Sequence, residues 1–274
     1  MIRVVDGRRV GFDDSGGSGT PVVLLHGFPL DRSIWDDVLP ALAAYRVVRV
    51  DLRGCGESDP GDGPALMEGL AADVHDLLDL LGIEKAAIAG HSIGGYVALS
   101  YFRLFAERCS GLALVASHAD PDAAFVPNPS PEQKALGAAR EALARALESE
   151  ASMEPAIASY LPRYFAPAVY GERPELVERA RAVMARQHPR GCAELVRGMA
   201  QRLDAWDVLP DIEVPSLVLA GGADYYLTVD GMRATAAAMH APLEVIESAG
   251  HLPQWEAPER TGEILARWLE RVGT

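Results

Sequence analysis

Three residues far apart in the chain have the types and contexts of a nucleophile, a base and a carboxylate that orients the base. Ser92 lies in the run GHSIG, Asp224 in GGAD and His251 in SAGHLP. A serine hydroxyl alone is a weak nucleophile and needs a base, usually a histidine that a carboxylate holds in one tautomer. The set therefore predicts nucleophilic catalysis by Ser92, with His251 as the base and Asp224 as the acid.

The sequence around Ser92 has the order strand, tight turn, helix. An apolar run at 86–89 precedes the turn, and a helical pattern follows it to about residue 106. A reactive serine must stand clear of its own backbone, and Gly90 and Gly94 leave room where a Cβ would collide with the neighbouring strand or helix. An incidental serine in a glycine-rich turn is disfavoured once Asp224 and His251 are counted.

Two backbone amides are expected to stabilise the negative charge that develops on a substrate oxygen. One belongs to Ile93, the residue after Ser92, and the other to Phe28, in the loop after the strand PVVLL. The helix that begins at Ile93 directs its first N–H groups toward the same point. The ring of Phe28 has a second interpretation, as a wall of the pocket.

Two aspartates compete for the role of the acid. Asp224 comes four residues after the strand PSLVLA, in a Gly-Gly loop that can bend toward His251. Asp120 also follows its strand, GLALVA, by four residues, but Asp120-Pro121 is typical of a turn that begins a new segment. The sequence favours Asp224, and Asp120 is the alternative.

Alternating strands and helices must position these residues. The predicted strands are 2–5, 9–14, 21–25, 46–50, 86–89, 111–116, 215–220 and 243–246, the first two joined at Asp6-Gly7. Helices are expected at 34–43, 66–81, 229–239 and 261–272, besides the one after Ser92. This order predicts a parallel sheet covered on both faces, with the site at the carboxyl ends of its strands.

The alternation breaks between about residues 119 and 207, where helical patterns at 132–150, 174–187 and 192–203 occur among prolines. We expect a helical lid of residues 119–207 inserted into a core of residues 1–118 and 208–274, and covering Ser92. The main aromatic residues of the lid are Tyr160, Tyr164, Phe165 and Tyr170. Each is expected either to line the pocket or to pack in the core of the lid.

Composition excludes several classes of function. The 274 residues carry 25 basic and 39 acidic side chains, and this net charge of −14 argues against nucleic acid as a partner. The start MIRVVDGRRV lacks the apolar run of a signal peptide, and no apolar segment reaches membrane-spanning length, so a cytoplasmic location is expected. Cys55, Cys109 and Cys192 form no C-x-x-C motif, so neither zinc nor a disulfide framework is indicated.

The motifs HGFP, DLRGCGES, GHSIGG, GGAD and GHLPQWEAPE occur in an order that resembles the capped α/β-hydrolases over nearly the whole chain. The resemblance implies a mostly parallel eight-stranded sheet flanked by helices, with an inserted helical lid. Serine at position 92 disfavours the haloalkane dehalogenases and epoxide hydrolases, whose nucleophile is aspartate. Two positions depart from the family pattern: Cys55, a thiol expected near the pocket entrance, and Tyr225, where proline is common.

The resemblance implies a cofactor-free, metal-free serine hydrolase that cleaves a small-molecule carboxylic ester through an acyl-enzyme on Ser92. The residues expected at the substrate pocket are His26, Gly27, His118, Tyr225 and Leu252. The remaining histidines have structural interpretations: His91 packs with its side chain away from Ser92, His75 lies on the surface, and His188 and His240 adjoin helix ends.

Other activities on the same framework remain open. A lactonase, such as an enol-lactonase, is the first alternative; C–C bond hydrolases, hydroxynitrile lyases and perhydrolases are similar frameworks, and a ligand-binding receptor is a different class. A lactone that carries a carboxylate calls for a lid arginine facing the pocket. Arg163, Arg186 and Arg190 are the candidates, although a solvated charge on the lid is the favoured interpretation of each. The sequence gives no indication of the oligomeric state.

Overall fold

The computed structural model describes residues 1–5, 7–120 and 130–273. Its centre is an eight-stranded sheet with the strand order β1-β2-β4-β3-β5-β6-β7-β8. The strands are β1 (Ile2–Val5), β2 (Arg8–Asp14), β3 (Pro21–Leu25), β4 (Arg46–Val50), β5 (Ala86–His91), β6 (Cys109–Val115), β7 (Ser216–Gly221) and β8 (Leu243–Ile246). β2 pairs antiparallel with β1 and β4, and every other pair is parallel. The predicted fold class is therefore confirmed; Asp6 of the predicted turn lies outside the described residues.

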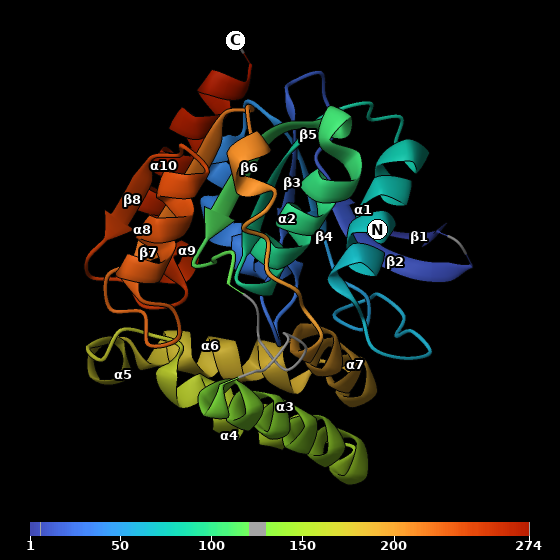
Figure 1. The fold of residues 1–274 in the computed structure, drawn as a ribbon, viewed down its shortest axis with the longest axis vertical. Helices are drawn as coiled ribbons and strands as arrows, with labels where there is room; N and C mark the ends of the chain where they lie inside the picture. The colour runs from blue at the N-terminus through green and yellow to red at the C-terminus, as the bar shows by residue number, and fades with distance from the viewer. Residues whose placement is uncertain (6, 121–129, 274) are drawn as a thin grey trace.

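Helices cover both faces of the sheet (Figure 1), which explains why β5 and β7 are apolar and fully buried. They are η1 (Arg32–Leu42), α1 (Met67–Leu80), α2 (Ile93–Phe105), η2 (Ala106–Arg108), η4 (Leu209–Asp211), α8 (Val229–Ala238), α9 (Pro253–Glu256) and α10 (Pro258–Val272). The short helix predicted at 34–43 is present as the 3₁₀ helix η1, and Pro40 within it lacks the N–H that an α-helix needs there. None of the helices in the described ranges is long and apolar enough to cross a membrane.

The connection from β6 to β7 contains helices and, in its described part, no strand. We call α3 to α7 the cap helices: α3 (Pro131–Glu150), α4 (Glu154–Tyr160), α5 (Val169–Glu172), α6 (Pro174–Ala185) and α7 (Pro189–Ala200), with the 3₁₀ turn η3 (Leu161–Arg163). They gather at one end of the sheet (Figure 1). Short α4 and α5 were not predicted, since four to seven residues are too few for a clear helical period.

Close backbone contacts fasten α7 to the core. A Cβ on Gly198 would lie 1.9 Å from the oxygen of Ala65, and one on Gly191 would lie 2.3 Å from the oxygen of Gly54. Glycine at these two positions of α7 lets the helix lie directly on the loops that follow β4.

Candidate active site

Ser92 stands at the turn between β5 and α2, with φ +52° and ψ −116°. This region is costly for a residue that has a side chain, so the packing around the turn must hold it. A Cβ on Gly90 would lie 2.0 Å from the oxygen of Gly94, and one on Gly94 would lie 2.5 Å from the oxygen of Leu25 in β3. Glycine is therefore needed on both sides of Ser92.

The imidazole of His251 meets the carboxylate of Asp224. His251 Nδ1 lies 2.7 Å from Asp224 Oδ2, and the two side chains are 5% and 0% exposed. The second oxygen, Oδ1, accepts hydrogen bonds from the amides of Tyr226 at 2.8 Å and Leu227 at 3.1 Å. The carboxylate is thus fixed by its own loop, and it orients the imidazole with Nδ1–H inward and the lone pair on Nε2.

Asp120, the alternative acid, takes part in different contacts. Its Oδ2 lies 3.1 Å from His118 Nδ1, and its Oδ1 accepts the indole N–H of Trp206 at 2.9 Å. The structure therefore brings Asp224, and not Asp120, to His251. Pro121, the second residue of the predicted turn, lies outside the described residues.

The amides of Ile93 and Phe28 are available to an anionic oxygen. Ile93 is the first residue of α2, where N–H groups have no partner within the helix. Among the residues that the structure describes, neither amide donates a hydrogen bond. Phe28 and Ser92 line the same cavity. The arrangement fits a pair of donors for charge that develops next to Ser92.

Hydrogen bonds hold the loop that carries Phe28. The Gly27 carbonyl, in the same peptide unit as the Phe28 N–H, accepts from Leu30 N at 3.0 Å and from His26 Nδ1 at 2.9 Å. His26 Nε2 in turn accepts from Leu52 N at 2.9 Å. Burial lowers the pKa of His26, which favours the neutral form that these bonds require.

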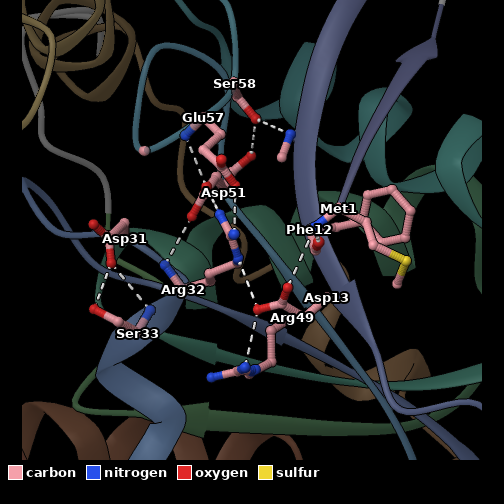
Figure 2. A network of polar contacts seen from close by, with 12 residues as sticks. Met1, Phe12, Asp13, Asp31, Arg32, Ser33, Arg49, Asp51, Glu57 and Ser58 are labelled. Atoms are coloured by element: carbon pink, nitrogen blue, oxygen red, sulfur yellow. Dashed lines mark hydrogen bonds and ion pairs between the residues drawn. The ribbon is translucent and has the colours of Figure 1, made fainter.

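A charged network extends this support (Figure 2). Asp51 accepts from the amides of Arg32 and Glu57, each at 2.9 Å, and forms an ion pair with the Arg32 guanidinium. Arg32 also donates to Asp13 in β2 at 2.9 Å. Burial opposes the charge of Arg32, but the surrounding carboxylates raise its pKa above the ordinary value. The network joins the loop at 26–32 to the loop at 51–58 through ion pairs and charge-assisted hydrogen bonds.

The loop that carries His251 is fixed by two residues whose roles the sequence reasoning missed. The Glu256 carboxylate accepts hydrogen bonds from Gly250 N at 2.9 Å, Leu252 N at 3.2 Å and Ala166 N at 2.8 Å. Burial raises the pKa of Glu256, and these amide bonds oppose that rise. The position of Glu256 in the motif GHLPQWEAPE is the signal that could have drawn attention to it.

His91 is the second such residue. It is fully buried, and its Nε2 donates to the main-chain oxygen of His251 at 2.7 Å. Burial lowers the pKa of His91 well below the usual range, so the ring is neutral. The sequence predicted only that His91 packs in the interior.

A cavity of about 390 Å³ lies between Ser92 and the cap helices. Its wall includes His251, Phe28, Tyr226, His118 and Tyr96 from the core, and Arg140, Tyr160, Arg163, Tyr164 and Met199 from the cap helices and the turns between them. Tyr160 and Tyr164 are thus pocket walls, whereas Phe165 and Tyr170 pack against each other with ring centroids 6.1 Å apart.

The other four residues expected at the pocket are not among those that line this cavity, which corrects the expected lining. His26 and Leu252 are 0% exposed. A Cβ on Gly27 would meet the ring of His91 and lie 3.3 Å from the Cβ of Ser92, so this residue packs against the turn at Ser92. Tyr225 is 62% exposed. Adjacency to a reactive residue does not place a side chain on the cavity, because neighbouring side chains point to different faces.

Of the candidate arginines, Arg163 lines the cavity, whereas Arg186 pairs with Asp31 and Arg190 with Glu194; the side chains of both these arginines are half-exposed, as expected of charges on the lid surface. The expectation for Cys55 is corrected. Cys55 is 0% exposed and does not stand at the cavity. A hydrogen bond with Cys192 and burial raise the pKa of the Cys55 thiol, so it behaves as a core residue.

The profile of the alpha/beta hydrolase family matches residues 22–264, and the chain belongs to this family. A thermophilic esterase from Thermogutta terrifontis, solved with malate bound, is 34% identical, covers 100% of this chain and 99% of its own, and has a TM-score of 0.90. The enol-lactonase from Burkholderia xenovorans LB400 is 26% identical, covers 98% and 100%, and has a TM-score of 0.87. The chain is also 32% identical, over 95% of its length, to the dihydrolipoyllysine-residue acetyltransferase component of the acetoin cleaving system of Pseudomonas putida; it spans 66% of that protein.

Proposed function

We propose that this hydrolase is a cofactor-free serine esterase that cleaves small-molecule carboxylic esters in the cavity beside Ser92. The observation that carries the proposal is the 2.7 Å contact between His251 Nδ1 and Asp224 Oδ2. His251 lines the same cavity as Ser92. The strained turn at Ser92 supports it, as do the amides of Phe28 and Ile93, which donate no hydrogen bond within the described part of the chain. The similarity to the Thermogutta terrifontis esterase points to the same class of substrate.

In the proposed reaction the Ser92 hydroxyl attacks the ester carbonyl while His251 Nε2 takes its proton. The tetrahedral oxyanion accepts hydrogen bonds from the amides of Phe28 and Ile93. The intermediate then expels the alcohol, which receives the proton from His251, and leaves an acyl group on Ser92. Water attacks this acyl-enzyme, gives its proton to His251 and releases the acid. Asp224 keeps the imidazole in one tautomer and stabilises its charged form.

We further propose that residues 119–207 act as a lid on this reaction. The cap helices and the turns between them supply more than half of the residues that line the cavity, including Tyr160 and Tyr164. A lid that covers the site excludes bulk water from the reacting atoms.

Steady-state kinetics with p-nitrophenyl acetate and butyrate test the proposal. We expect many turnovers per protein molecule. A single burst of product without further turnover contradicts it and favours a binding protein on the hydrolase fold.

A lactonase is the second candidate, because Arg163 lines the cavity, with its guanidinium 4.7 Å above the ring of Tyr225. An arginine at that place can bind a substrate carboxylate. Lactones with and without a carboxylate distinguish the candidates. Arg163→Gln should raise KM for the carboxylate-bearing lactone about tenfold if a lactonase is correct. Arg181→Gln, in α6 and in an exposed pair with Glu154, should not.

A further inference from the structure

Tyr164 connects the two loops that carry the proposed oxyanion donor and the base. It follows η3 in the cap, and it is 1% exposed. Its hydroxyl donates a hydrogen bond to the main-chain oxygen of Phe28. Its own main-chain oxygen accepts the N–H of His251 at 2.9 Å. One residue of the cap therefore contacts both catalytic loops directly.

The hydrogen bond from Tyr164 to Phe28 helps to fix the orientation of the Phe28 N–H. On the N-terminal side, the carbonyl of Gly27 is held by Leu30 and His26. On the C-terminal side, the hydroxyl of Tyr164 holds the carbonyl of Phe28 itself. The Phe28 N–H lies between these two fixed carbonyls, so its direction depends on both.

The ring of Tyr164 also lies against the imidazole of His251, with centroids 5.7 Å apart and an interplanar angle of 26°. Burial raises the pKa of Tyr164 well above its usual value, so the hydroxyl keeps the proton that it donates. Loss of that proton donor leaves the ring, its packing and the main-chain bond to His251 in place.

We propose that Tyr164 is a positioning residue of the reaction, which aims the Phe28 amide at the oxyanion and couples the cap to both catalytic loops. This inference rests on the proposed function, because it assigns the Phe28 amide to the oxyanion. A donor that is displaced stabilises the transition state less while the ground-state substrate binds as before.

Tyr164→Phe tests the inference, and Tyr45→Phe is the control. The Tyr45 hydroxyl also donates to a main-chain oxygen, that of Ala266 in α10 at 3.3 Å, and this bond lies outside the loops of Phe28 and His251. We expect Tyr164→Phe to lower kcat for p-nitrophenyl butyrate about 10- to 100-fold with KM within twofold, and Tyr45→Phe to change neither. The Ki of a trifluoromethyl ketone, which forms a tetrahedral oxyanion on serine, should rise by the same factor as kcat falls.

An unchanged kcat in Tyr164→Phe, a change in KM alone, or an equal loss in both variants overturns the inference. The Ser92→Ala protein, assayed in parallel, reports on the proposed function separately. If the wild-type protein turns over neither ester nor lactone, the proposed function fails and the inference fails with it. If wild-type activity depends on Ser92 and Tyr164→Phe retains it, the inference alone is wrong.

Discussion

Hydrogen bonds fix the orientation of the Asp224 carboxylate. Its Oδ1 accepts two amide bonds from residues 226 and 227, and its Oδ2 faces His251. The carboxylate therefore has no freedom to rotate away from the imidazole. Asp120 reaches the neighbourhood of the cavity through His118, and it has its own partner in Trp206.

Replacing these two aspartates with asparagine separates their roles. Asp224→Asn should lower kcat for p-nitrophenyl butyrate by up to about 10⁴-fold, because the amide can stabilise the wrong tautomer of His251. Asp120→Asn should retain activity within a few fold. Circular dichroism of both variants checks that they are folded. The reverse pattern would assign the acid to Asp120.

Local sterics made the turn at Ser92 predictable, and long-range packing made the cavity unpredictable. The requirement for Gly90 follows from Gly94, four positions away, whereas the requirement for Gly94 comes from the main chain of Leu25 in β3. The walls of the cavity, by contrast, combine side chains such as Tyr96 and Met199, more than a hundred positions apart. Which face of α2 or α7 meets the cavity depends on the packing of the cap, and no short motif encodes it.

Among the contacts that hold the cap to the core, two lines of contact involve different parts of the cap. At one line Tyr164 and Ala166 bond to the loops of Phe28, His251 and Glu256. At the other, glycines of α7 lie on the loops after β4. The helical pattern of 192–203 predicted that α7 exists, but the two glycines of its contact face carried no periodic signal.

Gly198→Ala tests the second line. The added Cβ would lie 1.9 Å from the Ala65 oxygen, so α7 must shift, and we expect the free energy of unfolding to fall by about 1–3 kcal/mol. Gly171→Ala, in α5, where no described atom beyond the local chain and helix backbone lies within 4 Å of the new Cβ, should not lower it. Urea unfolding measures both. Equal stabilities would show that the close contact is not required.

Buried neutral histidines link the stability of the whole protein to pH. His26 and His91 are fully buried, and burial lowers the pKa of each below the value of about 6.5 that it has in an unfolded chain. Below that pH the unfolded state binds protons that the folded state does not. Their contribution to stability is therefore complete above about pH 6.5 and is lost as the pH falls toward the folded-state pKa values.

We expect the free energy of unfolding, measured in urea, to decrease from pH 7.5 to pH 5.5, and to decrease less steeply in His91→Asn. Glu256, whose pKa is raised by burial, acts in the opposite direction. It is present in both proteins, so it cancels in the comparison. Identical slopes for the two proteins would contradict the role given to His91.

The most direct test of nucleophilic catalysis by Ser92 is the rate at which Ser92→Ala hydrolyses p-nitrophenyl butyrate. The rate is compared with that of the wild-type protein after circular dichroism has verified that both proteins are folded. No neighbouring group can replace the nucleophile at the strained turn, so kcat should fall by about 10⁶-fold while the melting temperature stays close to that of wild type. A folded Ser92→Ala protein that hydrolyses the ester near the wild-type rate would contradict nucleophilic catalysis by Ser92.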